Sequence, residues 1–228
     1  MSEIIKDDNL SRIIEKKMLI QNLVSIEEIE ELNVSNRNLR QEDLKIDLSE
    51  IYKIKNLNKI TLKFFEITDE VIYVINKLEF LETIEFSTCL FKTNKMLSGS
   101  LKTIFIYNCE IFNIDIISRC ELLEEFLVIH SGVIDINKLT KYKNLRFIKL
   151  AHCNVIGFSN LSKLTNLEEL YLNSINIPEK LNISKMYNLK YISLNGSKVI
   201  DKSGFIKDLK EQQRNLIIKF EDEDHPIE

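Results

Sequence analysis

The sequence predicts an α/β solenoid, a curved stack of about eight short repeats whose parallel strands form a concave sheet. Three segments carry this prediction: LRFIKLAHCNV at Leu145 returns as LEELYLNSINI at Leu167 and begins again as LKYISLNGSKV at Leu189. The first residues of these three segments are 22 residues apart. A fixed period of about 20 to 50 residues is typical of stacked repeat arrays, so we expect each repeat to pack against its neighbours.

Length and composition are those of a soluble protein. A repeat array can hold 228 residues as one domain, and no apolar run is long enough to span a membrane. The start, MSEIIKDDN, lacks the cationic and apolar regions of a secretory signal, which predicts a cytoplasmic protein. With 31 basic and 35 acidic residues intermixed, there is no basic stripe for phosphates. We therefore expect neither nucleic acid nor a membrane as partner.

The first segment, residues 1–24, is predicted to be a helical cap. Its apolar residues recur at roughly helical spacing, with charged residues between them. Such a helix would cover the apolar interior that the first repeat leaves open, although a partner-binding helix is an alternative. The apolar positions are Ile4, Ile5, Leu10, Ile13, Ile14, Met18, Ile20 and Leu23.

The repeats occupy residues 25–200. The steps between their starts are 28, 24, 20, 22, 22, 22 and 22 residues, so the first connections are expected to carry extra helical or loop residues. The eight starts are Ile29, Leu57, Leu81, Leu101, Leu123, Leu145, Leu167 and Leu189.

Two periodicities within each repeat predict its core. The fourth and sixth positions alternate as inward residues of a short strand. They are Ile60, Leu62, Ile84, Phe86, Ile104, Ile106, Phe126, Val128, Ile148, Leu150, Leu170, Leu172, Ile192 and Leu194. The connections then carry an apolar residue at every third position, which favours 3₁₀ or one-turn helices on the convex side. These residues are Ile111, Ile114, Ile117 and Cys120, then Val133, Ile136, Leu139 and Tyr142, then Val155, Phe158, Leu161 and Leu164.

The repeat unit matches the pattern L-x-x-L-x-L-x-x-N/C-x-L. The segment LSKLTNLEELYLNSINI resembles the 22-residue leucine-rich repeats of internalins and of the small phosphatase-regulatory repeat proteins, and the resemblance covers residues 25–200. It implies a leucine-rich-repeat solenoid that recognises a protein on its concave face. It names no partner.

The last segment, residues 201–228, is predicted to be a C-terminal cap followed by an acidic tail. SKVIDKSGFIKDLKEQQRN predicts a turn and a helix, and LIIKF predicts a last strand. Together they would cover the final repeat. The tail EDEDHPIE is expected to be a solvated end, with an interaction arm as the alternative.

The cysteines are predicted to be structural. Cys89, Cys109 and Cys153 occupy the ninth motif position, where this repeat accepts Asn or Cys, and Cys120 falls in the every-third apolar series. No Cys-x-x-Cys pair suggests zinc, so we expect no metal and no cofactor.

His130 and His152 share the eighth motif position of consecutive repeats, which predicts that they lie about 5 Å apart on adjacent strands. They could share a metal or a proton. Two partly exposed histidines at the edge of the binding face are the favoured interpretation, because no third ligand is in register with them. Neither a nucleophile constellation nor a Gly-rich phosphate loop is present in the sequence.

The third, fifth and seventh positions predict the exposed face of the sheet. In the first three repeats they are polar: Glu31, Asn33, Ser35, Lys59, Thr61, Lys63, Thr83, Glu85 and Ser87. In the next five they become rich in large apolar groups, with charges among them. The predicted partner-binding residues are Phe105, Tyr107, Leu127, Ile129, Phe147, Lys149, Tyr171, Tyr191, Glu125 and Glu169.

The sequence thus favours a non-enzymatic scaffold, a monomer when free, that binds a protein partner and regulates or inhibits it, as immunity proteins do. A metal-dependent enzyme using His130 and His152, or a purely structural spacer, are the alternatives. Loss of partner capture on changing the exposed face separates the first hypothesis from the third.

Overall fold

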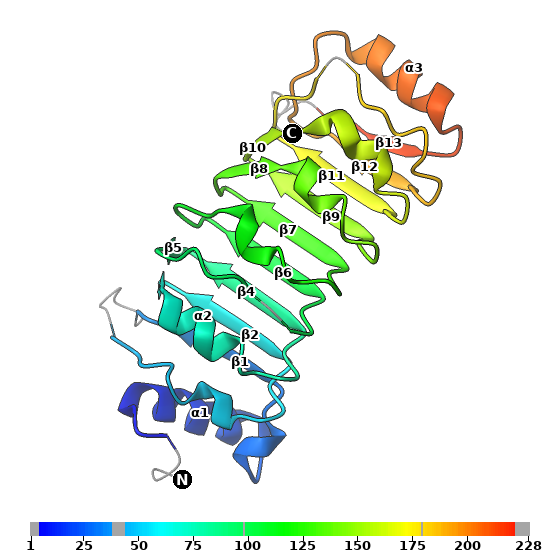
Figure 1. Ribbon diagram of the computed structural model, residues 1–228. Coiled ribbons are helices and arrows are strands. Elements are labelled where there is room, and N and C mark those ends of the chain that lie inside the picture. Colours follow the sequence, from blue (N-terminus) through cyan, green and yellow to red (C-terminus); the bar gives the residue numbers. More distant parts are fainter. Residues whose placement is uncertain (1–4, 38–43, 98, 179, 222–228) are drawn as a thin grey trace, which may run out of the picture. The chain divides into compact units, whose positions relative to one another are not determined.

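The computed structural model describes residues 5–37, 44–97, 99–178 and 180–221, and the parts of the predicted N-terminal helix and acidic tail beyond them lie outside the described residues. The chain divides into two compact units, Met1–Glu121 and Leu122–Glu228. Each unit contains a run of parallel strands with short helices and turns between them (Figure 1).

The main strands from β1 to β11 fall at the third to seventh positions of the repeat motif, as predicted, and β12 covers the third to fifth. The first unit orders them β1-β2-β4-β6 and the second β7-β9-β11-β12-β13. Pairing joins equal motif positions, as in Ile60 with Ile84 and Leu170 with Ile192. The bounds are β1 Glu31–Ser35, β2 Lys59–Lys63, β4 Thr83–Ser87, β6 Thr103–Tyr107, β7 Glu125–Ile129, β9 Phe147–Ala151, β11 Glu169–Asn173, β12 Tyr191–Ser193 and β13 Ile217–Lys219.

The core lies on the inner side of these strands. The fourteen predicted inward residues of the fourth and sixth positions, from Ile60 to Leu194, are all 0% exposed. Burying each such side chain stabilises the fold by about 1.5–3 kcal/mol relative to leaving it in water. The α/β repeat fold predicted from the sequence is therefore confirmed.

Short turns and helices return the chain to the next strand, as the three-residue period predicts. The 3₁₀ turns are η1 Ile26–Glu28, η2 Ile51–Lys53, η3 Ile114–Ile117, η4 Ile136–Leu139 and η5 Phe158–Lys163. The 24-residue second step holds the helix α2, Asp69–Ile75, whose first turn is capped by the Thr68 hydroxyl. Two small parallel pairs lie beyond the main strands: β3 Glu66–Ile67 with β5 Leu90–Phe91, and β8 Val133–Asp135 with β10 Asn154–Ile156.

The every-third prediction is wrong at Ile111 and Val133, which are 74% and 50% exposed. In each case the next residue, Phe112 or Ile134, is buried instead. A residue in the left-handed region, Ile111 itself or Gly132, both at φ 55°, inserts one extra position before the inward residue. Phe158, expected inside, is half-buried, while the other members of the series are buried.

The N-terminal helix α1 runs from Asp8 to Gln21. The Asp7 carboxylate accepts a hydrogen bond from the Leu10 N–H at 2.7 Å, and Asn22 ends the helix at φ 53°. One face, formed by Leu10, Ile14 and Met18, is buried. The other leaves large apolar side chains in solvent: Leu19 is 78% exposed, Ile20 69% and, just beyond the helix, Val24 86%.

The C-terminal helix α3 and strand β13 follow the order that the sequence predicts. α3 spans Lys202–Gln212, with its first turn capped by the Asp201 carboxylate, and buries Phe205 and Leu209. β13 pairs in parallel with β12. No helix in the described ranges is long and apolar enough to span a bilayer.

We expect α3 to be required for stability, because it buries the side chains of Phe205 and Leu209. Leu209 is 0% exposed, so Leu209→Ala should lower the free energy of unfolding by about 2–5 kcal/mol. Lys207→Ala on the same helix is the control, since the Lys207 side chain is 79% exposed. Urea unfolding of the full chain measures both, and an unchanged midpoint for Leu209→Ala would contradict the capping role.

Candidate functional site

Most of the main strands are followed by a residue in the left-handed conformation. This eighth-position row contains Phe64, Thr88, Asn108, His130, His152 and Ser174, with φ between 49° and 60°, and Gly196 at 66°. The conformation costs a non-glycine residue about 1–2 kcal/mol. It lets the backbone N–H donate to the next repeat, as His152 does to the Asn173 carbonyl at 3.1 Å. We call this row the rim.

The ninth-position cysteines hydrogen-bond to backbone carbonyls, as predicted. The thiols of Cys89, Cys109 and Cys153 donate to carbonyls of their own or the preceding repeat, the shortest contact being Cys153 Sγ to the Ala151 oxygen at 3.1 Å. Ser197 fills the same position in the last repeat, and its hydroxyl lies 2.6 Å from the Leu172 oxygen. All four cysteines are free thiols, and Cys120 is 0% exposed.

These surroundings make the Cys89 and Cys153 thiols poor nucleophiles, whereas the hydrogen bond with Cys89 lowers the pKa of the buried Cys109 thiol. The pKa of Cys89 is raised, first by its hydrogen bond with the Cys109 thiol and then by burial. Burial also raises the pKa of Cys153. Because the thiolate is the reactive form, Cys89 and Cys153 contribute to structure rather than chemistry.

His130 and His152 lie side by side on the rim, as the repeat spacing predicts. Their ring centroids are 4.2 Å apart and the ring planes differ by 7°, a face-to-face stack. Both side chains are exposed. Within the ranges that the structure describes, no cluster of three or more His, Cys, Asp or Glu side chains has the geometry to hold a metal ion.

The second motif position carries a charge row that the sequence analysis missed. Lys102 pairs with Glu82 at 2.7 Å, Arg146 with Glu124 at 2.6 Å, and Lys190 with Glu168 at 2.5 Å. The sequence does contain the pattern that predicts these ion pairs, since acidic and basic residues alternate at this position from the third repeat to the eighth. Exposed pairs of this kind contribute about 0–1 kcal/mol each, so they add little to the stability of the fold.

The exposed strand face of the second unit combines aromatic and charged residues. Register places Glu125, Phe147, Glu169 and Tyr191 in one row across β7, β9, β11 and β12. The next row along the strands is Leu127, Lys149, Tyr171 and Ser193. Ile129 follows on β7, half-buried. We call these residues the aromatic face.

Three rings form the centre of the aromatic face. The Tyr171 ring lies 5.2 Å from the Phe147 ring and 5.2 Å from the Tyr191 ring, centroid to centroid. Its hydroxyl donates to Glu169 Oε2 at 2.9 Å, and Lys149 Nζ lies 5.9 Å from its centroid. Burial, followed by the hydrogen bond to Glu169, raises the pKa of Tyr171 to about 12, so the phenol stays neutral at physiological pH. The rings are half-buried and cover one another in part.

The strand face of the first unit is mainly polar. Phe105 and Tyr107 lie on β6, with ring centroids 6.4 Å apart, and Tyr107 is 41% exposed. Thr61, predicted to be exposed, is only 3% exposed, because neighbouring side chains cover it; its hydroxyl lies 3.4 Å from Glu85 Oε2. The predicted binding residues therefore divide between the two units, with eight of the ten on the second.

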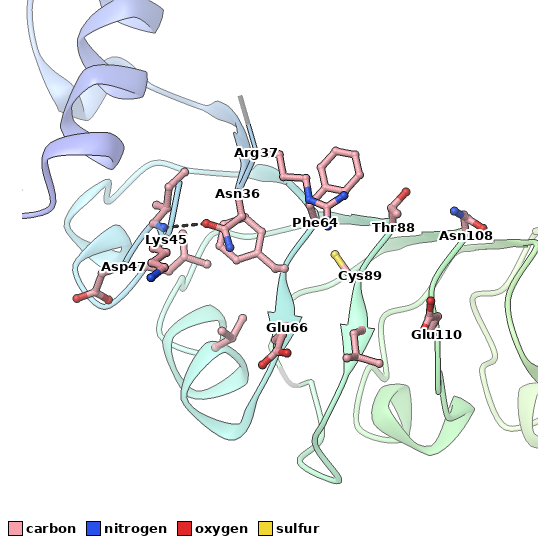
Figure 2. Close-up of a pocket in the computed structure, with 15 residues that line it drawn as sticks. Asn36, Arg37, Lys45, Asp47, Phe64, Glu66, Thr88, Cys89, Asn108 and Glu110 are labelled. Atoms are coloured by element: carbon pink, nitrogen blue, oxygen red, sulfur yellow. Dashed lines mark hydrogen bonds between the residues drawn. The ribbon is translucent and has the colours of Figure 1, made fainter. Parts of the chain in front are cut away.

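The first unit also has an open groove of about 820 Å³ beside its rim. Figure 2 shows polar side chains at its edge, among them Arg37 beside the Phe64 ring, with 4.9 Å from the guanidinium carbon to the ring centroid. The Asn36 side chain accepts a hydrogen bond from the Ile46 N–H at 2.8 Å. Charges of both signs line the groove, and its one thiol, Cys89, is buried, so we assign it no ligand.

Comparisons with known proteins agree with this geometry. An internalin (inlF) of Listeria monocytogenes has 18% sequence identity and a TM-score of 0.61, over 97% of this chain and 70% of the internalin. A leucine-rich-repeat protein of Leptospira interrogans has 18% identity and a TM-score of 0.56, over 88% of this chain and 51% of that protein. A TDR receptor has 19% identity and a TM-score of 0.56, over 91% of this chain and 37% of the receptor.

The sequence matches no protein-family model and no curated protein. At these identities the structural likeness establishes the fold, and it is the fold that the repeat pattern predicts. The chain therefore has the leucine-rich-repeat fold that these proteins share.

We expect all four cysteines to react slowly with Ellman's reagent in the native protein. Three are buried, and the raised pKa values of Cys89 and Cys153 reduce their thiolate fractions at pH 8. Denaturation in urea should release four fast-reacting thiols, with half-buried Cys153 the first to react under native conditions. Rapid native labelling of three or more thiols would show that the ninth position does not point inward.

Proposed function

We propose that this chain is a non-enzymatic scaffold that binds a partner protein through the aromatic face of its second unit and thereby regulates or inhibits that partner. The observation that carries the proposal is the three-ring cluster of Phe147, Tyr171 and Tyr191 on an open strand face. Aromatic side chains are enriched among the residues that dominate interface energetics.

Rigid positions favour recognition by this cluster. The rings stand on paired strands, and each touches a neighbouring ring, so little side-chain entropy remains to be lost on binding. They are only half-buried, which leaves part of each ring for a partner. The ring-to-ring contacts also lower the cost of exposing them in the free protein.

Charges around the rings would orient the partner. Glu125 and Glu169 lie in the same row as Phe147 and Tyr191, and Lys149 lies beside Tyr171. Such groups contribute to orientation and association rate more than to affinity. Leu127 and Ile129 extend the apolar surface on β7. On the first unit, Phe105 and Tyr107 would provide apolar contact surface for the partner.

The chemistry of the described residues supports binding over catalysis. The cysteines hydrogen-bond to the backbone with raised thiol pKa values at Cys89 and Cys153. The hollow that the stacked histidines line is otherwise formed by Ser174, two asparagines, small and apolar side chains, Lys149 and Glu221. Nucleophilic catalysis needs a nucleophile held by a base at hydrogen-bond distance, and the two imidazole rings instead stack face to face on each other.

The double variant Phe147→Ser, Tyr191→Ser tests the proposal. Each lost anchor should weaken partner binding by about 2 kcal/mol or more. The free energy of unfolding should fall by about 1 kcal/mol or less per site, because both rings are half-buried on the solvent side. Capture of proteins from the source cells by immobilised wild type and variant, compared by mass spectrometry, gives the readout.

Tyr187→Ser is the matched control, since Tyr187 lies four residues away from Tyr191, is 75% exposed and belongs to no strand. Its capture profile should equal that of the wild type. A folded double variant that captures the same protein at full strength would show that the aromatic face is not the binding site. The exposed apolar residues of α1, Leu19 and Ile20, would then be the next candidates.

A further inference from the structure

The stacked histidines of the rim have a geometry that the scaffold function does not use. His130 follows β7 and His152 follows β9, and both belong to the second unit. Adjacent strands lie about 4.8 Å apart, yet the ring centroids are only 4.2 Å apart and nearly parallel. The imidazole groups therefore lie closer together than the strands that carry them.

The backbone fixes both residues in one conformation. Each has φ 52°. The His130 N–H donates to the Ala151 carbonyl at 3.0 Å, and the His152 N–H donates to the Asn173 carbonyl at 3.1 Å. The backbone of the site therefore needs little ordering when an ion binds.

We propose that His130 and His152 form a surface site for one divalent transition-metal ion of the kind that prefers imidazole, such as Ni²⁺ or Zn²⁺. Each ligating nitrogen must lie about 2.0–2.1 Å from a zinc ion, which puts the two nitrogens of a tetrahedral site about 3.3 Å apart. Because the lone pairs of stacked rings run parallel, both exposed rings must rotate about their side-chain torsions to bring the two nitrogens to that spacing. Water supplies the remaining ligands.

The surroundings define which ions would bind. The histidines border a hollow of about 500 Å³ that is also lined by Asn173, Asn195 and Glu221. The Glu221 backbone N–H donates to the Asn195 side chain at 3.0 Å, which keeps this carboxylate near the hollow. The Cys153 thiol follows His152 in the sequence, but it donates a hydrogen bond to the Ala151 carbonyl and does not take part in the site. The site therefore offers nitrogen and oxygen donors rather than thiolate.

The positive charge of Lys149 opposes the binding of a cation, because Lys149 also lines the hollow. Its ammonium lies 5.9 Å from the centroid of the Tyr171 ring, toward the aromatic face. Removing this charge with Lys149→Gln should therefore strengthen metal binding. The effect is expected to be smaller than that of either histidine, since Lys149 is no ligand.

The rim supplies matched variants. Asparagine occupies the same position at Asn108, with φ 49°, so His130→Asn and His152→Asn preserve a conformation that this repeat accepts. Ser174 is the next rim residue, with φ 52° and its N–H donating to the Asn195 carbonyl at 2.8 Å. Ser174→His should add a third imidazole to the row and increase affinity.

Calorimetric titration of the full chain with NiCl₂ tests the site. We expect one Ni²⁺ per wild-type chain, at least tenfold weaker binding by His130→Asn or His152→Asn, and at least tenfold tighter binding by Ser174→His. The melting temperature should rise with Ni²⁺ in the wild type and not in the double histidine variant, because an ion that binds the folded state stabilises it. MgCl₂ should give no heat of binding, since Mg²⁺ prefers oxygen ligands.

His225→Asn is the control for the third histidine of the sequence, which lies outside the described residues. Its Ni²⁺ affinity should equal that of the wild type. The proposal is overturned by a wild type that binds no Ni²⁺ at millimolar concentration, by a double His130→Asn, His152→Asn variant that binds as the wild type does, or by loss of binding in His225→Asn.

Discussion

In-register pairing of parallel strands is the constraint on which the other features of this molecule depend. Equal motif positions pair, as in Phe126 with Ile148 and Ile148 with Leu170, and these inward side chains are fully buried. A slip by one residue would turn a whole strand's apolar set toward water. Because the register is held, every motif position becomes a row of neighbours, which explains the thiol and hydroxyl row, the ion pairs and the stacked histidines.

The sequence predicted the strands and their core because both follow from a strict period. The connections follow it less strictly: Ile111 and Gly132 adopt φ 55° and each shifts the inward residue by one, a backbone choice that apolar spacing does not reveal. The outward direction of the face residues was also predictable from alternation. The diagonal contacts of Tyr171 with two rings were not, since they depend on side-chain torsions and on how far a ring reaches across strands. Use of that face for binding stays a prediction, as does the cytoplasmic location.

The same scaffold assigns different chemistry to different rows. The inner rows are apolar and give stability, the ninth position satisfies backbone carbonyls, and the second position pairs charges at the surface. What remains variable is the outward face and the rim, where residues change without disturbing the register. The second unit places aromatic rings on the face and histidines on the rim. Function on such a scaffold is therefore a matter of which side chains the fixed rows present.

Binding through the aromatic face would bury its rings against a partner, and hydroxyl-radical footprinting of the captured complex measures that burial. Side-chain oxidation would be measured by mass spectrometry in the free protein and in the complex. The account predicts strong protection of Phe147, Tyr171 and Tyr191 in the complex, with unchanged oxidation of Tyr187 and Tyr52, which are 75% and 41% exposed. Unprotected rings on the aromatic face, together with protection of Leu19 and Ile20 on α1, would contradict it.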